Sequence, residues 1–452
     1  MNLIEAVKAA GIVGAGGAGF PTHVKLNAKA EWFIVNAAEC EPLIETDKYL
    51  CRTFADRVVA AAMAISAHLE AEHTVIALKR KYTAEIAALR AVIDKTGVPV
   101  TLVEMDTFYP AGDEQTLVQL VTGRSVPERG LPLNVGAVVD NVGTLLNIEA
   151  MLTRGEPVTE KYLSVVGEVR EPIMLRVPIG TAITACIEAA APNLKEYAII
   201  IGGPMMGKVV ADPEAISKAV VTKTTGNIIV LSKDHYLIQR AQRPIERIRV
   251  QARSACIQCR MCTDLCPRYL IGHQMHPHLV MRNLYREPFI EDKDEFLHAF
   301  GDAANCCSCG VCEMFACPMG LSPCKVNEYI KVKLRERGID VPKNAEPQAK
   351  KRIEMHRIPT ARLIARLGLA DYNGLHAHTC IDLAPDSVFV PFSQHIGKPA
   401  VAVKHAGENV EKGELLAAAA EGGLSANIHA SVSGVITEIS AAGATIVRHK
   451  EA

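Results

Sequence analysis

The chain has 452 residues, with 49 lysines and arginines against 50 acidic residues, and a formal net charge of -1. This balance excludes a general basic surface for nucleic acid, and no apolar run reaches the roughly 18 residues that predict a membrane span. The N-terminus does not read as a secretory signal. We therefore expect a cytoplasmic protein whose 14 cysteines more often bind metal than form disulfides.

A glycine-rich loop comes first, because residues 11–25 read GIVGAGGAGFPTHVK. The glycines at 14, 16, 17 and 19 let backbone N–H groups approach a phosphate or a planar ring closely. A Rossmann fingerprint needs a strand before such a loop, and residues 3–10 predict a helix instead, so we reject that fingerprint. A merely flexible loop is the alternative.

Three polar turns each follow a short apolar segment in the first third of the chain. The strand WFIVN opens residues 32–50, a glycine turn precedes a helix in 109–124, and 138–151 predict strand, turn and helix. Ligand sites in α/β sheets lie at such turns. The pattern predicts a ligand site in an α/β domain.

The segments GAGGAGFPTHVK, NAAECEP, YPAGDEQTL and DNVGTLLNI resemble the flavin- and NADH-binding segments of the 51-kDa subunit of respiratory complex I. They resemble the RnfC subunits of Rnf electron-transport complexes more closely. The order is the same, and the match covers about residues 1–155. This chain departs from the complex I subunit at two positions. It has Ala28 where that subunit has an aromatic residue, and Asp140 where that subunit has an asparagine.

The resemblance implies that FMN lies between the glycine loop and the NAAECEP loop, with NADH stacked above it. It implies that the nicotinamide stacks on Phe20 and that Glu114 bonds the NADH ribose or amide. The remaining assignments group by ligand: contact with flavin or nucleotide for Gly14, Gly16, Gly17, Gly19 and Lys25; the FMN lining for Asn36, Glu39 and Glu41; and the surroundings of the FMN phosphate for Asn141 and Thr144.

The middle of the chain predicts strand, turn, strand and helix over 162–190, then a strand and a glycine turn over 198–210. This order resembles the soluble-ligand-binding β-grasp domain that follows the flavin domain in the same families. We expect the turn GGPMMG to be a hairpin. A ligand contact by this turn is the alternative.

The first cysteine run, CIQCRMCTDLCP at 256–267, has the spacing C-x2-C-x2-C-x3-C-P. This is the bacterial iron–sulfur run, in which a short chain curls around a cubane cluster. Zinc more naturally uses two separated C-x2-C pairs. The run predicts Cys256, Cys259, Cys262 and Cys266 as ligands.

A second run at 306–318 has one residue more before its last cysteine, and it predicts Cys306, Cys309, Cys312 and Cys317 as ligands. Two such runs predict a two-cluster ferredoxin module, in which the fourth cysteine of each run ligates the other cluster. The expected ligand sets are Cys256, Cys259, Cys262 and Cys317 for the first cluster, and Cys306, Cys309, Cys312 and Cys266 for the second.

For most of the other cysteines and for the linker histidines, the sequence predicts structural rather than metal-binding roles. Cys307 is an alternative to Cys306 as a ligand, but register with the first run favours Cys306, and Cys324 is left over. Histidines 273, 276 and 278, in the linker between the runs, are expected on the surface of a helical insertion, with a metal site as the alternative. Four isolated cysteines are expected to be small buried side chains: Cys40, Cys51, Cys186 and Cys380.

Residues 389–440 resemble the two halves of a lipoyl-like barrel-sandwich domain. Its central hairpin, AEGGLSA, has no lysine to modify, so we expect a structural or docking module. RnfC subunits carry a similar module at the N-terminus. The C-terminal position resembles the cobalamin reductases of propanediol-utilisation microcompartments, a resemblance that covers the whole chain. The basic segment 341–375 before it predicts a solvated helix face, with a partner contact as the alternative.

The expected fold class is multidomain α/β and α+β. The expected boundaries are 1–158 for an FMN- and NADH-binding α/β domain, 159–245 for a β-grasp domain, 246–335 for a ferredoxin-like module with two [4Fe-4S] clusters, 336–385 for a helical linker, and 386–452 for an unmodified barrel-sandwich domain.

The expected function follows from electron counting. NADH gives a hydride and clusters move single electrons, so a flavin belongs between them. We expect an NADH-dependent cobalamin reductase inside a bacterial microcompartment. The expected partners are cobalamin or a corrin-binding adenosyltransferase, and the shell proteins of the microcompartment. A homo-oligomer is one possible state of the chain. The alternatives are an RnfC-like subunit of a membrane-associated complex and a non-catalytic electron-wiring protein.

Overall fold

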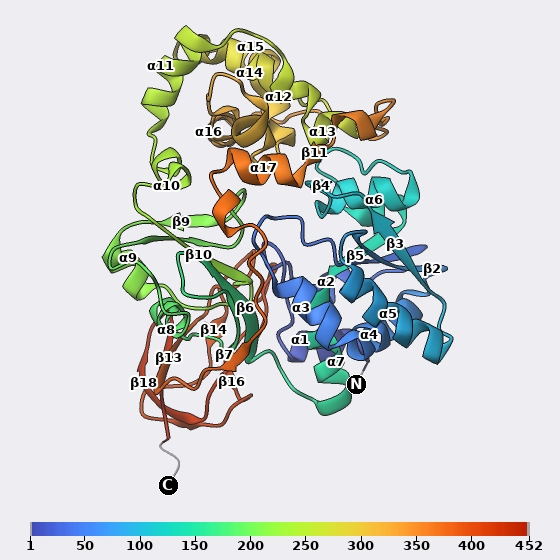
Figure 1. Cartoon of the computed structure of the whole chain (residues 1–452), viewed down its shortest axis with the longest axis vertical. Coiled ribbons are helices and arrows are strands. Elements are labelled where there is room, and N and C mark those ends of the chain that lie inside the picture. The colour runs from blue at the N-terminus through green and yellow to red at the C-terminus, as the bar shows by residue number, and fades with distance from the viewer. Residues whose placement is uncertain (1, 450–452) are drawn as a thin grey trace.

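A computed structural model describes residues 2–449. The N-terminal part, blue to cyan in Figure 1, is built on a parallel sheet of order β3-β2-β1-β5. The sheet strands are β1 (Trp32–Asn36), β2 (His73–Lys79), β3 (Val100–Met105) and β5 (Ala137–Asn141). The helices are α1 (Leu3–Ala9), α2 (Thr22–Lys25), α3 (Thr46–Thr53), α4 (Ala55–Leu69), α5 (Thr83–Thr96), α6 (Glu114–Thr122), the 3₁₀ turn η1 (Pro132–Val135) and α7 (Val142–Arg154).

Strand β1 matches the predicted segment WFIVN, and its side chains alternate between the two faces of the sheet. Phe33 and Val35 join the core formed with α4, α5 and α7. Ile34 points to the opposite face, where it joins the core that includes Leu117 of α6. Helices therefore cover both faces of the parallel sheet, which explains why its strands are almost wholly apolar.

The expectation that a strand of the sheet leads directly into each of the three turns is wrong for the segment 109–124. Strand β4 (Phe108–Tyr109) is only two residues long and pairs antiparallel with β11 (Ile358–Pro359), outside the parallel sheet. Pro110 follows it and has no N–H to extend the pairing. The chain nevertheless turns into α6, whose N-cap Asp113 accepts a hydrogen bond from the Thr116 N–H at 3.0 Å.

The middle of the chain forms a six-stranded mixed sheet of order β12-β7-β6-β10-β8-β9, with helices α8 and α9. Strands β8 and β9 form the predicted hairpin around GGPMMG. The bounds are β6 (Glu160–Gly167), β7 (Ile173–Pro178), α8 (Ile183–Ala189), β8 (Ala198–Ile201), β9 (Lys208–Val210), α9 (Pro213–Lys218), β10 (Asn227–Leu231) and β12 (Cys380–Asp382).

The cysteine-rich part is helical and lies at the top of Figure 1. Its core includes Phe296, Phe300, Val326 and Ile330. The bounds are α10 (Tyr236–Ala241), α11 (Ile245–Ala255), α12 (Met261–Asp264), α13 (Pro267–Leu270), α14 (Pro277–Asn283), η2 (Leu284–Phe289), α15 (Lys293–Phe300), η3 (Gly301–Asn305), the π-helical turn η4 (Val311–Ala316) and α16 (Pro323–Glu336).

The linker expected to be helical is only partly so. It contains α17 (Thr360–Arg366) and the 3₁₀ turns η5 (Ile353–His356) and η6 (Ala370–Tyr372). Its other regular elements are β11 and β12, which complete the pairing of β4 and extend the six-stranded sheet. The basic residues 350–352 are exposed, as predicted, but they lie at a turn rather than on a helix.

The C-terminal part consists of two small sheets, β13-β19-β18-β15 and β14-β16-β17. Residues 419–427 connect β16 to β17, and the core of this part is continuous with that of the N-terminal domain. The bounds are β13 (Ser387–Pro391), β14 (Val401–Ala402), β15 (Asn409–Val410), β16 (Leu415–Ala418), β17 (Ile428–His429), β18 (Gly434–Ile439) and β19 (Gly443–Arg448). Within residues 2–449, no helix has the length and apolar character needed to span a membrane.

Candidate functional site

A cavity of about 1170 Å³ lies between the N-terminal domain and the six-stranded sheet. It exceeds the roughly 300–1,000 Å³ of most ligand sites, so it has room for more than one ring system. Eleven of the twelve residues assigned to flavin or NADH line it: Gly14, Gly16, Gly17, Gly19, Phe20, Lys25, Asn36, Glu39, Glu41, Glu114 and Asn141. Ala28, at the missing aromatic position, is not among its lining residues.

Thr144 is the residue of that set that does not line the cavity. Its hydroxyl is fully buried and accepts a hydrogen bond of 3.0 Å from the Ala15 N–H. Thr144 therefore anchors the glycine loop through its backbone without lining the cavity. A side chain at Gly17 would meet no atom within 4 Å, whereas a Cβ at Gly16 would lie 2.7 Å from Asn141 Nδ2. Gly17 thus faces open space and Gly16 packs on Asn141.

Lys25 connects the glycine loop to the end of β5 and the start of α6. Its ammonium donates to the Val139 carbonyl at 2.7 Å and to Glu114 at 3.1 Å, and it lies 3.6 Å from Asp140. Burial raises the pKa of Asp140 to about 6, although the Lys25 charge opposes this. Asp140, which replaces the family's asparagine, is thus a buried partner of Lys25.

The NAAECEP loop places two carboxyl groups in a dry part of the cavity. Burial raises the pKa of Glu41 to about 7, and burial together with the Asp47 charge raises the pKa of Glu39 well above its usual range. Glu41 accepts a hydrogen bond from the Met205 N–H at 2.9 Å. Asp47 accepts one from Asn141 at 2.7 Å. A carboxyl group with a raised pKa holds its proton to a higher pH than usual, and in its protonated form it can donate a hydrogen bond to a ligand.

The turn GGPMMG is both a hairpin and a wall of this cavity. Gly202, Gly203, Met206 and Gly207 line it. A Cβ at Gly203 would lie 2.2 Å from the carboxylate of Glu41, so the close approach of the two loops needs glycine there. The segment GGPMMG therefore forms the hairpin that we expected and also lines the cavity, as the alternative required.

Cys40 differs from the expected small buried side chain, because it is partly exposed and lines the cavity. Burial raises its pKa to about 12, which makes it a neutral thiol. Cys51 and Cys186 are buried as predicted, whereas Cys380 is partly exposed in the edge strand β12.

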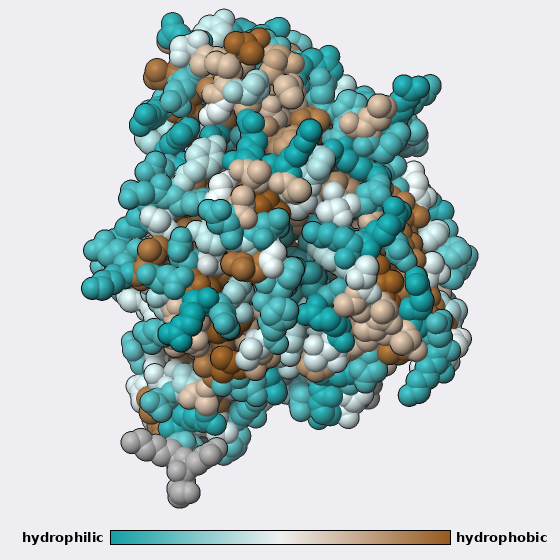
Figure 2. Space-filling model, in the orientation of Figure 1, coloured by the Kyte–Doolittle hydropathy of each residue, from teal (hydrophilic) through white to brown (hydrophobic). Residues whose placement is uncertain are grey.

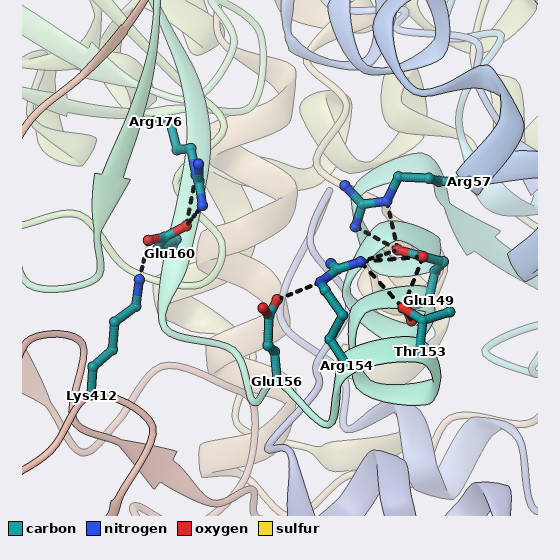
Figure 3. Close-up of polar contacts among 8 residues, drawn as sticks. All are labelled: Arg57, Glu149, Thr153, Arg154, Glu156, Glu160, Arg176 and Lys412. Atoms are coloured by element: carbon teal, nitrogen blue, oxygen red, sulfur yellow. Dashed lines mark hydrogen bonds and ion pairs between the residues drawn. The ribbon is translucent and has the colours of Figure 1, made fainter.

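A network of charged side chains lies along one end of the cavity (Figure 3) and was not anticipated from the sequence. Arg57 donates to Glu149 at 2.6 Å, and Arg154 donates to Glu156 at 3.0 Å. Across the cavity, Arg176 donates to Glu160 at 2.7 Å, and Lys412 of the barrel-sandwich part also pairs with Glu160. The drawn network has four basic side chains for three carboxylates, which leaves an excess positive charge.

Those residues come from α4, α7, the segment after α7, β6, β7 and the C-terminal part. No short motif contains them, so sequence spacing gave no signal for their meeting.

The two cysteine runs fold into matching loops. In each, the second and fourth residues after the first cysteine have left-handed φ: Gln258 and Arg260 in one, Ser308 and Gly310 in the other. Such turns form nests of backbone N–H groups that bind anions, iron–sulfur clusters included. The Ser308 N–H donates a hydrogen bond to Cys306 Sγ at 3.4 Å. These loops fit the clusters that the spacing predicts.

The extra residue of the second run is absorbed by the π-helical turn η4, between Cys312 and Cys317. The equivalent segment of the first run is the short α-helix α12, which packs against η4. A π-turn holds one residue more than an α-turn over the same span and is frequent at functional sites. Cys317 therefore keeps the place that the one-residue insertion would otherwise shift.

The thiols lie near one another in the crossed arrangement. Burial, followed by the thiols of Cys256, Cys259, Cys317 and Cys266, raises the pKa of Cys262 to about 12. The thiol of Cys266, which has the smallest effect of these four, also lies within electrostatic reach of the second run: Cys306, Cys307, Cys309 and Cys312. The crossed ligand sets remain a prediction, which these neighbours support.

Within residues 2–449, no three histidine, cysteine or acidic side chains converge closely enough to hold a single metal ion. A four-iron cluster needs no such convergence, because its four thiolates bind different irons.

Cys266→Ala is expected to damage the second cluster more than the first, because Cys266 lies among the second set of thiols. Anaerobically reconstituted protein is expected to bind about eight irons as two clusters. Iron analysis and electron paramagnetic resonance (EPR) of the variant check the assignment. Selective loss of the first cluster would contradict the crossed arrangement.

The linker histidines differ from the expected surface residues. His273 is buried, and its Nε2 lies 2.8 Å from the Val126 carbonyl oxygen. His276 pairs with Asp302 at 2.7 Å, and His278 with the Thr263 hydroxyl at 2.7 Å. Each ring has a separate protein partner, and the metal alternative finds no support.

The second cysteine run reaches the cavity itself, because Cys309 is one of its lining residues. The Tyr109 hydroxyl donates to the Cys309 carbonyl at 2.8 Å. Arg268, two residues after Cys266, forms a bidentate pair with Asp113 at 2.6 and 2.8 Å. Although burial alone would raise it, the Arg268 guanidinium holds the pKa of Asp113 below its ordinary value. These contacts fix the cysteine-rich part against the flavin-type domain.

Comparisons with known proteins agree with this organisation. Residues 7–150 match the Nuo51 FMN-binding domain family, residues 255–322 the 4Fe-4S dicluster domain family, and residues 377–451 the RnfC barrel sandwich hybrid domain family. The resemblance to the complex I subunit and to RnfC is confirmed, and so are the multidomain fold class, the flavin domain and the two-cluster domain.

Three curated relatives extend the comparison. The chain is 39% identical over 448 residues to the cobalamin reductase PduS of Citrobacter freundii, covering 98% of this chain and 96% of the relative. It is 40% identical to PduS of Salmonella typhimurium, with the same coverage. It is 33% identical to one component of the proton-translocating ferredoxin:NAD(+) oxidoreductase complex of Clostridium ljungdahlii, covering 63% of this chain and 60% of that component.

The match to PduS covers nearly the whole chain, including the barrel-sandwich part at the C-terminus. The resemblance to RnfC did not explain this C-terminal position, because RnfC subunits carry the similar module at the N-terminus. The chain is thus an oxidoreductase with an FMN-binding domain and a 4Fe-4S dicluster domain, and it belongs to the PduS cobalamin reductase family.

Proposed function

We propose that the protein transfers electrons from NADH to cobalamin, with FMN in the cavity and two [4Fe-4S] clusters between them. Bound FMN supplies the conversion of a two-electron hydride donor to single electrons. The observation that carries the proposal is that Cys309, a predicted ligand of the second cluster, lines the same cavity as the glycine loop. Flavin and cluster would therefore be neighbours.

The residues of the cavity have distinct proposed tasks. Gly17 leaves room for the ligand and exposes its backbone, and Lys25 supplies positive charge beside it. In their protonated forms, the carboxyl groups of Glu39 and Glu41 can donate hydrogen bonds to the flavin ring. Arg176 and Lys412 share the single carboxylate Glu160, and the excess positive charge that this leaves suits the phosphates of a dinucleotide. None of these residues needs to act as a general acid.

The second cluster is proposed to receive electrons first and the first cluster to pass them on. Cys309 lies at the cavity, whereas Cys259 of the first cluster is exposed. Beside it, Ile257 is 61% exposed and Met261 43% exposed. Figure 2 shows apolar residues gathered over the cysteine-rich region. Exposed apolar side chains around a cluster provide a surface on which an acceptor can dock.

The relatives' names support cobalamin as the acceptor, either free or bound to a corrin-binding adenosyltransferase. A place inside a propanediol-utilisation microcompartment, contacts with its shell proteins and a homo-oligomeric state belong to the same proposal. So do the domain boundaries at 158, 245, 335 and 385.

Glu114→Ala is expected to raise the Michaelis constant for NADH with unchanged FMN content. Losing one charge-assisted hydrogen bond to the ribose or amide would cost about 1.5–3 kcal/mol, or roughly ten- to a hundredfold. Lys25 would keep its contacts with Val139 and Asp140, so the site should stay intact.

Steady-state kinetics with NADH, and with dithionite as a donor that bypasses the site, measure the effect of Glu114→Ala. The exposed residue Glu72 supplies a control, because Glu72→Ala should change neither rate. Equal losses with both donors in Glu114→Ala would place Glu114 outside the NADH site.

The purified chain, reconstituted anaerobically, tests the proposed acceptor against the two alternatives. Reduction of cob(III)alamin by NADH without other proteins supports the proposal. NADH oxidation that proceeds only with partner proteins would favour an RnfC-like role. Clusters that accept electrons from dithionite but never from NADH would favour the electron-wiring role.

A further inference from the structure

The second cluster site contains more thiols than one four-iron cluster binds. Its expected ligand set is Cys266, Cys306, Cys309 and Cys312. Cys307 and Cys324 lie beside these residues. The thiols around Cys262 in the first site, by contrast, all belong to the two expected ligand sets. A [4Fe-4S] cluster takes four cysteines, so the second site has two thiols in surplus.

Cys324 is the second residue of α16 and is 7% exposed. Helix α16 packs against η3, which ends immediately before Cys306, and against η4, which contains Cys312. This packing places the thiol of Cys324 beside both of those thiols. It therefore reaches two ligand positions of the same cluster.

Cys307 has different neighbours from Cys324. Its thiol lies beside that of Cys309, and the guanidinium of Arg268 lies near it. Although Cys307 follows Cys306 directly in the chain, its thiol partner is Cys309, whereas the thiol partners of Cys324 are Cys306 and Cys312. The two surplus thiols are therefore placed differently, and Cys324 is the one that touches Cys306.

We infer that Cys324 is a reserve ligand of the second cluster, able to bind the iron that Cys306 otherwise holds. In the exchange, the iron–sulfur bond to Cys306 breaks and a bond to Cys324 forms. The proton of the Cys324 thiol passes to the Cys306 sulfur through the contact between them. Charge and oxidation state are conserved, so the exchange needs no added oxidant or reductant.

Cys306 is partly exposed and Cys324 is buried, so the more accessible ligand has a protected substitute. This role needs only the cluster, whatever the electron donor and acceptor are.

The test uses the full chain, reconstituted anaerobically, as Cys306→Ala, Cys324→Ala and the double variant. Each single variant is expected to keep about eight irons, and the double variant about four. The EPR signal of the second cluster should shift in Cys306→Ala, because one ligand has changed. The signal of the first cluster should stay in all three, which reports that the chain has folded.

Two further variants serve as controls. Cys259→Ala in the first site, where no surplus thiol exists, is expected to lose half of the iron by itself. Cys306→Ala combined with Cys307→Ala is expected to keep about eight irons, because Cys324 and not Cys307 is the substitute.

Three results would overturn the inference. The first is loss of the second cluster in Cys306→Ala alone. The second is its loss in Cys324→Ala alone, which would make Cys324 a resident ligand. The third is a double variant that still holds both clusters.

Discussion

Gly17→Val is expected to leave the protein with almost no FMN. Gly17 faces open cavity, and its backbone lies outside the left-handed region, so valine can be built there without backbone strain. Its branched side chain would instead project into the space proposed for the flavin ring or phosphate. Binding weakened at least tenfold corresponds to about 1.4 kcal/mol, and direct overlap should exceed this.

Flavin content after anaerobic reconstitution measures the effect of Gly17→Val, and iron content is the internal control. The clusters lie in the cysteine-rich part, so about eight irons should remain. Gly17→Ala, with a single methyl group, should give a smaller loss. Gly16→Val is a weaker test, because its side chain would first collide with Asn141. A Gly17→Val protein that stays yellow would refute the placement of FMN.

Arg268→Met is expected to lower the stability of the contact between the flavin domain and the cysteine-rich part. The Arg268 and Asp113 side chains are only 10% and 16% exposed, and their pair is bidentate. Removing one partner of a buried pair leaves an uncompensated charge, at a cost of about 3–5 kcal/mol. The denaturant midpoint should fall, and electron transfer from flavin to cluster should slow.

Anaerobic urea unfolding, followed through cluster and flavin absorbance, measures the effect of Arg268→Met. Arg90→Met breaks an exposed pair with Glu104 and should cost about 0–1 kcal/mol. Adding Asp113→Asn to Arg268→Met should recover part of the loss, because the stranded charge is then gone. A midpoint unchanged in Arg268→Met would show that the pair contributes nothing net.

The pH dependence of the same pair has a defined sign. Arg268 holds the folded-state pKa of Asp113 below its unfolded value. The stabilisation is therefore complete above the ordinary carboxyl pKa of about 4, and it is lost as pH falls through the lowered folded value.

Local sequence patterns predicted the elements that carry the site. WFIVN became β1 because a continuous run of apolar residues fits a parallel sheet covered on both faces, and Asp113 began α6 because its side chain caps the helix. The cysteine spacing predicted two matching loops. The extra residue of the second run was visible in the sequence, and its π-helical form follows from packing against α12.

What the sequence did not predict depends on long-range pairing. Strands β11 and β12 are two and three residues long, too short for a periodic pattern, and they exist because β4 and β7 offer open edges. His273 can be buried because its ring contacts the Val126 carbonyl of the N-terminal domain, which is far away in the sequence. Cys324 meets Cys306 only through the packing of α16 on η3.

One anaerobic NADH titration tests the central claim most directly, with flavin, cluster and cobalamin absorbance followed together in the reconstituted protein. The account predicts that NADH reduces flavin and clusters and then converts added cob(III)alamin, and that the Gly17→Val protein does none of this with NADH yet keeps clusters that dithionite reduces. NADH-driven cluster reduction in the flavin-free protein would contradict the claim that FMN stands between NADH and the clusters.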